Sequence, residues 1–249
     1  FLRAHNGGNT LVLNGDAPFV SAEVLKTALA AHVGQGNAVT VISAELDDPS
    51  GYGRIVRDPA TGLVRAIVEQ KDADEATLAV REINSGAYWF RTDDLLSILG
   101  CIRNDNAQGE YYLTDAVRLL IEQNKNAGAY IASDPAAVMG ANDCVQLNSL
   151  NEIARERVLH AQMLAGVEIP CTDGVLIGPD VTIGRSTRIL PNTILRGNTA
   201  VGADCSIGPS VVLTDCTVGD GASLCFASCE HTNISSSQAV APFTVIGTP

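Results

Sequence analysis

The hydrophobic positions of the chain follow one pattern up to Pro170 and a different one after it. In the first part, short apolar runs alternate with amphipathic stretches. Thr10–Leu13 has the pattern of a buried strand, Ser21 caps an expected helix over Ala22–His32, and Ala38–Leu46 is a second apolar, β-branched strand. Strand, helix and strand in this order are typical of a βαβ unit. The pattern therefore predicts an α/β domain with a mostly parallel sheet and helices on its faces.

The rest of the first part continues this alternation. A Gly-Tyr-Gly loop precedes a predicted hairpin, and the longest helical pattern of the chain closes this part. Its wide polar face is typical of a helix that connects two bodies. The expected strands are Arg54–Val56, Leu63–Glu69, Ile83–Phe90 and Ala129–Ala132, and the expected helices are Asp93–Cys101, Tyr112–Asn126 and Cys144–Ala165.

After Pro170 an aliphatic residue recurs at every sixth position. A period of six fits neither a helix, with its period of about 3.6, nor a strand that alternates between two faces. Sustained hexapeptides indicate a parallel β-helix, in which the recurring residue points into the core. The spacing slips by one residue at Val218 and returns to six between Val240 and Ile246. The recurring positions are Ile177, Ile183, Ile189, Leu195, Val201, Ile207 and Leu213, and a second register holds Val175, Val181, Thr187, Thr193, Thr199, Cys205 and Val211.

The two patterns divide the chain into three predicted parts. An α/β domain occupies residues 1–143, a linker helix 144–166, and the β-helix 167–249. The chain opens at Phe1, and we expect that the first strands of the α/β domain are missing from it.

Composition and charge narrow the classes of function. Hydrophobic residues make up 46% of the chain, as in a globular protein, and the formal net charge is −12. Nucleic-acid binding in general depends on Lys and Arg to neutralise phosphates, so this charge argues against it. No apolar run approaches the roughly 20 residues that cross a bilayer, and no basic-then-apolar leader opens the chain. We therefore expect a cytoplasmic protein without a membrane or nucleic-acid partner.

The chain has seven cysteines, several of which gather late in the sequence. Cys225 and Cys229 satisfy only the first half of a zinc-binding spacing, which needs two further ligands at a comparable spacing; His231 follows closely. Reduced thiols in a reducing compartment are the better interpretation.

Polar residues at the ends of the predicted strands are candidates for the functional site. Asn14-Gly15-Asp16 follows the first strand, where open α/β sheets bind ligands, although the same tripeptide is ordinary turn chemistry. Gly53 lies in a glycine-rich loop before a strand, and Glu69 follows one. Asn84 lies inside an apolar strand, where its amide needs a partner from the backbone or from a ligand.

Six motifs occur in one order ahead of the hexapeptides, namely LVLNGD, PSGYGRIV, IVEQKDA, EINSGAYWF, NAQGEYYLTD and GANDCVQL. Along essentially its whole length the chain resembles the bacterial bifunctional N-acetylglucosamine-1-phosphate uridylyltransferase/glucosamine-1-phosphate acetyltransferases. The resemblance implies a Rossmann-like nucleotidyltransferase domain followed by a left-handed parallel β-helix that assembles as a homotrimer.

The resemblance also implies an activity: uridylyl transfer from UTP to N-acetylglucosamine 1-phosphate, giving UDP-N-acetylglucosamine and pyrophosphate. The sugar phosphate is itself the nucleophile, so no residue of the chain is assigned as a catalytic acid or base, and alignment and charge neutralisation dominate. Matched by motif, Asp16 and Asn142 would bind Mg²⁺. The Gly53 backbone, Glu69 and Asn84 would bind the sugar, and the Asn14-Gly15 backbone would lie beside the substrate.

Two departures from the family pattern limit the expected activity. The glycine-rich, basic stretch that wraps the UTP phosphates and the segment that grips uracil do not occur in the sequence. The coils that bind acetyl-CoA in the family would follow Pro249, and His231 does not match the family's catalytic histidine. We therefore expect no measurable uridylyl transfer by this chain alone. Two alternatives stay open: a glucose-1-phosphate-type nucleotidylyltransferase with a β-helix tail, and a non-catalytic trimeric scaffold.

Overall fold

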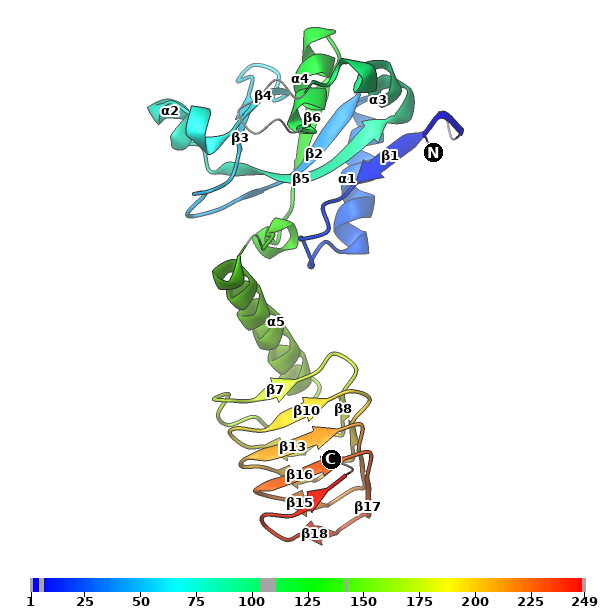
Figure 1. Cartoon of the computed structure of the whole chain (residues 1–249), viewed down its shortest axis with the longest axis vertical. Helices are drawn as coiled ribbons and strands as arrows, with labels where there is room; N and C mark the ends of the chain where they lie inside the picture. Colours follow the sequence, from blue (N-terminus) through cyan, green and yellow to red (C-terminus); the bar gives the residue numbers. More distant parts are fainter. Residues whose placement is uncertain (1, 5–6, 104–110, 142, 248–249) are drawn as a thin grey trace. The chain divides into compact units, whose positions relative to one another are not determined.

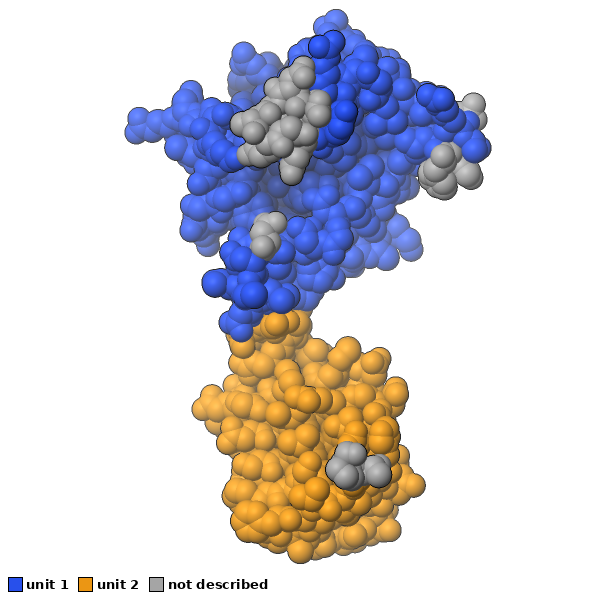
Figure 2. Space-filling model, viewed as in Figure 1, with its two compact units in different colours: residues 1–150 blue, residues 151–249 orange. Residues whose placement is uncertain are grey.

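The computed structural model describes residues 2–4, 7–103, 111–141 and 143–247. It divides into two compact units, Phe1–Leu150 and Asn151–Pro249, which Figure 2 colours separately. The long helix α5 (Cys144–Leu164) contributes residues to both units. The division into a domain, a linker helix and a β-helix at residues 143 and 166 stays a proposal.

The first unit contains a mixed sheet of six strands (Figure 1). The strand order is β4-β3-β5-β2-β6, and β1 pairs with β5. The strands are β1 (Asn9–Val12), β2 (Val39–Glu45), β3 (Arg54–Arg57), β4 (Val64–Val68), β5 (Glu82–Arg91) and β6 (Ala127–Ile131).

The sheet differs from the expected, mostly parallel one in how its strands pair. The predicted βαβ unit is present, with Ser21 Oγ accepting the Val24 amide at 3.2 Å to cap α1 (Ala22–Gly34). However, β1 and β2 are not neighbours, because Phe90 of β5 pairs with Thr10 on one side and Val39 on the other. β5 is antiparallel to both of them and to β3, and β3 is antiparallel to β4. The pair of β2 and β6 is therefore the one parallel pair among these six strands.

Helices cover both faces of this sheet. On one face α1 and the 3₁₀ turn η4 (Pro135–Val138) bury Ile42 and Ile83, and on the other α3 (Thr92–Ile98) and α4 (Thr114–Glu122) bury Phe90. The helix expected from Tyr112 therefore begins two residues later. The shorter elements are η1 (Leu2–Ala4), η2 (Gln70–Asp72), α2 (Glu75–Leu78) and η3 (Leu99–Cys101).

The second unit is a left-handed parallel β-helix, as predicted. Its short strands form three parallel sheets, of five, four and four strands (Figure 1). Ile177 pairs with Leu195, which pairs with Leu213, so three hexapeptides make one coil. The strands are β7 (Leu176–Ile177), β8 (Thr182–Ile183), β9 (Arg188–Ile189), β10 (Ile194–Arg196), β11 (Ala200–Val201), β12 (Ser206–Ile207), β13 (Val211–Thr214), β14 (Thr217–Val218), β15 (Ser223–Leu224), β16 (Ala227–Glu230), β17 (Asn233–Ile234), β18 (Ala239–Val240) and β19 (Val245–Ile246).

The slip in the hexapeptide spacing does not interrupt the stack. Val218 still pairs with Val201, and Cys229 pairs with Leu213, because later coils lose residues at their corners rather than on their faces. Leu224 and Ile234 also occupy stacked positions, which the strict six-residue pattern does not identify. The left-handed conformation of Asp215, with φ of 51°, marks one such corner.

Hydroxyl groups and thiols fill the second register of the β-helix. Thr187, Thr193 and Thr199 are fully buried, and each hydroxyl donates to a backbone carbonyl at 2.6–2.7 Å. Cys205 and Cys216 are buried in this register, and Cys229, which pairs with Leu213, is buried in the first one. In the described residues no three His, Cys, Asp or Glu side chains gather as metal ligands would, so the half-pattern for zinc gains no support. The described helices include none that is long and apolar enough for a membrane span.

Candidate functional site

Strand pairing brings three of the predicted site residues together at one end of the β3–β4 hairpin. Arg54 pairs with Val68, so Gly53 and Glu69 lie opposite each other just beyond the paired residues. A methyl group on Gly53 would lie 3.3 Å from both Glu69 carboxylate oxygens. The backbone N–H of Asn84 donates to the Gly53 carbonyl at 2.8 Å. Residues that are far apart in the sequence therefore form one cluster.

A β-bulge in β5 shapes the next part of the site. The register between β2 and β5 shifts so that Ile42 faces Ala87 while Ser43 faces Asn84. The two intervening residues leave the ladder, and Gly86 adopts a φ of 78°. Bulges of this kind bend a strand and re-aim its side chains, and they are frequent beside active sites.

Asn14 lies directly against this bulge. A methyl group on Gly86 would come within 2.2 Å of the Asn14 amide nitrogen, so only glycine leaves room there. The turn that follows β1 therefore reaches the same cluster as Gly53, Glu69 and Asn84.

Asp16 lies on the other side of this turn, against the segment that ends in Gly140 and Ala141. Its backbone carbonyl accepts the Ala141 amide at 3.3 Å, and a methyl group on Gly140 would lie 3.0 Å from its carboxylate. The predicted second metal ligand, Asn142, is the next residue and lies outside the described residues. Gly15 and Asp16 also line a cavity of about 410 Å³, together with Pro18, Ala141, Asp143, Cys144, Leu147 and Leu150.

Two tyrosines that we did not predict as site residues complete the cluster. The Tyr88 hydroxyl donates to the Asn84 side-chain oxygen at 2.9 Å, and the Tyr52 hydroxyl contacts the Gly140 backbone. Burial raises the pKa of both phenols; the charge of Glu69 raises that of Tyr88 further, and the charge of Asp16 that of Tyr52. Both therefore stay protonated at neutral pH, and the Tyr88 hydroxyl is the hydrogen-bond donor that holds Asn84.

The Asn84 side chain is held with its oxygen occupied. That oxygen accepts from the Gly86 amide at 3.1 Å as well as from Tyr88. Within the described parts of the chain its amide nitrogen has no acceptor, which leaves a donor for a ligand. The Gln70 side chain also accepts the Gly51 amide and ties down the glycine-rich loop. Gly51, Tyr52, Gln70 and Gly86 all lie in motifs that the sequence made visible, but their residue types alone did not mark them as site residues.

The carboxylate of Asp16 fits a magnesium ligand by its chemistry. It is exposed and, among the described residues, makes neither a hydrogen bond nor an ion pair. Mg²⁺ prefers oxygen ligands and is usually bound by one or two carboxylates together with substrate phosphates. An exposed carboxylate beside a cavity meets the first requirement.

Comparison with known proteins places this geometry in a family. The family model described as nucleotidyl transferase matches residues 1–156. The chain belongs to the nucleotidyl transferase family. A second model, described as bacterial transferase hexapeptide (six repeats), matches residues 180–215 of the β-helix.

Curated relatives are similar to this member of the family along most of its length. The chain is 40% identical to the bifunctional protein GlmU of Caldanaerobacter subterraneus over 96% of this chain and 52% of the relative. It is 42% identical to that of Streptomyces avermitilis, over 96% of this chain and 50% of the relative. It is 44% identical to that of Trichlorobacter lovleyi, over 86% of this chain and 46% of the relative. The chain thus spans about half the length of the curated relatives that it matches.

Proposed function

We propose that the first unit carries the sugar-binding half of a uridylyltransferase, which transfers uridylyl from UTP to N-acetylglucosamine 1-phosphate. The observation that carries the proposal is the meeting of Asn14, Gly53, Glu69 and Asn84 at one end of the β3–β4 hairpin, beside the bulge in β5. A carboxylate and a free side-chain amide are groups that bind sugar hydroxyls and an N-acetyl carbonyl. The family resemblance of the motifs that hold them supports this choice of sugar.

In this proposal the residues of the chain bind and orient rather than exchange protons. The Glu69 carboxylate accepts a hydrogen bond from a sugar hydroxyl, and the Asn84 amide nitrogen donates to the sugar. Tyr88 and the bulge hold Asn84 in place. The phosphate of the sugar attacks the α-phosphorus of UTP directly, so a correct alignment provides much of the rate enhancement.

Asp16 would hold Mg²⁺, with Asn142 as the second protein ligand from just beyond Ala141. When bound, the cation neutralises the phosphate oxygens. Gly15 has no neighbouring atom within 4 Å of a methyl group built upon it, so the backbone beside Asp16 is open to approach by a ligand.

Isothermal titration calorimetry of the chain with UDP-N-acetylglucosamine tests the proposal. We expect Mg²⁺ to strengthen binding to the unsubstituted chain and to have no such effect on Asp16→Asn. Glu69→Gln should weaken binding about tenfold, since a hydrogen bond to a charged group contributes about 1.5–3 kcal/mol. Glu23→Gln, in the exposed first turn of α1, is the matched control. Equal binding of UDP-glucose would favour the glucose-1-phosphate-type alternative, and no binding of either would favour the scaffold. We expect no pyrophosphate release from UTP by the chain alone.

The β-helix would belong to the acetyltransferase half of the same enzyme, which uses acetyl-CoA, and would assemble as a cytoplasmic homotrimer. The match to hexapeptide transferases supports the first part. Apolar side chains on one outer face, including Leu176 at 41% and Val245 at 79% exposure, are consistent with assembly through the β-helix. Analytical ultracentrifugation of the chain would measure its oligomeric state.

A further inference from the structure

Arg54, the first residue of β3, is a buried cation that forms no ion pair with any residue that the structure describes. The residue is 2% exposed. Among the described residues no carboxylate lies within ion-pair distance of its guanidinium group, and its Nε has no hydrogen-bond partner. An unpaired charge inside a protein costs stability, so its presence calls for an explanation.

The guanidinium group makes one hydrogen bond that bears on the site: its Nη1 donates to the Tyr52 backbone carbonyl. That carbonyl and the Gly53 N–H belong to the same peptide group. Because a trans peptide is planar, its N–H points in the opposite direction from its C=O. Fixing the Tyr52 carbonyl therefore fixes the direction of the Gly53 N–H.

The Gly53 amide is otherwise uncommitted. Its carbonyl accepts from Asn84, but its N–H has no acceptor within the part of the chain that the structure describes. Gly53 is buried beneath the Glu69 carboxylate, so an oxygen that reaches this N–H also lies within reach of that carboxylate. A hydroxyl group satisfies both at once, since it can accept from the amide and donate to the carboxylate.

We propose that Arg54 is a positioning residue, which orients and polarises the Tyr52–Gly53 peptide so that the Gly53 N–H donates to a sugar hydroxyl. This inference rests on the proposed function and assigns a role to a residue outside the sugar contacts. A charged donor on a carbonyl draws electron density from the amide and strengthens its N–H as a donor, as in other cooperative hydrogen-bond chains. The buried charge thus acts on the substrate through a backbone amide.

The sequence offers a direct probe of this peptide. Tyr52–Gly53 is the sole Tyr–Gly pair in the chain. Labelling tyrosine with ¹³C at the carbonyl and glycine with ¹⁵N therefore gives a single carbonyl-correlated amide signal, that of Gly53. We expect it to move when UDP-N-acetylglucosamine binds, and its exchange with solvent deuterium to slow.

Arg54→Met and Arg54→Lys separate charge from packing. We expect Arg54→Met to shift the ligand-free Gly53 proton upfield and to weaken sugar-nucleotide binding about fivefold, the scale of one hydrogen bond. Arg54→Lys restores most of both effects, because its ammonium group can also donate to the Tyr52 carbonyl. Arg65→Met, an exposed arginine on β4, is the matched control and changes neither.

Each outcome decides the inference. A Gly53 signal and a Kd that are unchanged in Arg54→Met overturn it, as does an Arg54→Lys variant that is as impaired as Arg54→Met. If Arg54→Met fails to fold, the exchange measurement on the unsubstituted chain decides, and exchange that the ligand leaves unchanged overturns the inference. A wild-type Gly53 signal that no sugar nucleotide moves counts against the sugar site as well. A response that persists in Arg54→Met counts against the role of Arg54 alone.

Discussion

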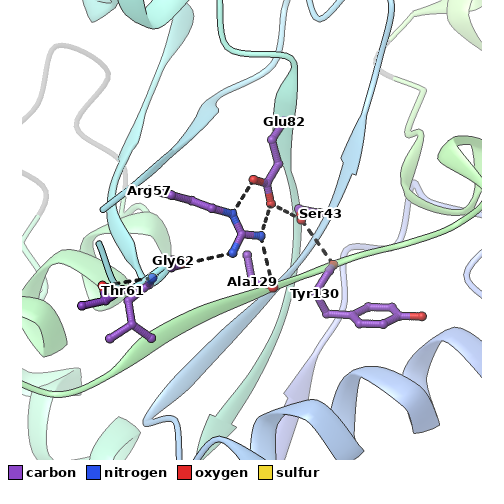
Figure 3. Close-up of polar contacts among 8 residues, drawn as sticks. Ser43, Arg57, Thr61, Gly62, Glu82, Ala129 and Tyr130 are labelled. Atoms are coloured by element: carbon purple, nitrogen blue, oxygen red, sulfur yellow. Dashed lines mark hydrogen bonds and ion pairs between the residues drawn. The ribbon is translucent and has the colours of Figure 1, made fainter. Parts of the chain in front are cut away.

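The ion pair between Arg57 and Glu82 should contribute measurably to the stability of the first unit. The Arg57 guanidinium binds both Glu82 oxygens at 2.7 Å (Figure 3). It also donates to the Gly62 and Ala129 carbonyls, while the Ser43 hydroxyl donates to Glu82 at 2.6 Å. The group thereby links β2, β3, β5 and β6. Arg57→Met removes the cation and leaves the carboxylate in place.

The magnitude follows from how far the pair is removed from water. The Glu82 side chain is 9% exposed and that of Arg57 30%. Leaving one partner of a fully buried pair without its counter-ion costs about 3–5 kcal/mol. Because the arginine is partly solvated and Ser43 still donates to the carboxylate, we expect about 2 kcal/mol. The exposed pair Arg118–Glu122, at 58% and 56%, is the matched control, and Arg118→Met should cost no more than about 0.5 kcal/mol.

Urea unfolding followed by tryptophan fluorescence measures this difference. Trp89 is the single tryptophan of the chain and lies in β5, so its emission reports on the first unit and not on the β-helix. With a denaturant slope of about 2 kcal/mol per molar, Arg57→Met should move the midpoint down by about 1 M at an unchanged slope. A shift no larger than that of Arg118→Met would show that the buried pair does not hold these strands together.

Three further predictions concern the bulge, a buried histidine and the β-helix. Gly86→Ala and Gly62→Ala both force alanine into left-handed φ, so each should lower the free energy of unfolding by about 1 kcal/mol in urea titrations. Only the methyl group of Gly86→Ala meets the Asn14 side-chain amide, so only this variant should weaken UDP-N-acetylglucosamine binding in calorimetry. Burial holds the pKa of His32 below its ordinary value of 6.5. The stabilising contribution of neutral His32 is therefore present above pH 6.5 and is lost as the pH falls below this value. His32→Gln should reduce the pH dependence of the free energy of unfolding in urea titrations at pH 5–7. Thr199→Val removes the acceptor of the buried Cys216 backbone amide and should lower the free energy of unfolding of the β-helix by about 1–3 kcal/mol. Circular dichroism would measure this transition, because tryptophan fluorescence reports only on the first unit.

Local sequence signals were enough to predict the elements that depend on near neighbours. Ser21 caps α1 because a hydroxyl at that position accepts an amide three residues on, whatever the rest of the fold does. The β-helix is likewise visible because each coil repeats the same short-range pattern, and Ile177, Leu195 and Leu213 stack as their spacing requires. The motifs also marked Gly53, Glu69 and Asn84 as candidates before their contacts were known.

The sequence by itself thus determined the period of each element, the caps and the residue types of the site. Tertiary structure decided which strands pair and which side chains meet. β5 separates β1 from β2, the bulge at Gly86 admits Asn14, and the peptide before Arg54 is held by a buried cation. These features depend on contacts between residues far apart in the chain. Their free energy comes from packing and hydrogen bonding that no local pattern records, because a periodic sequence specifies which face is buried but not what will be buried against it.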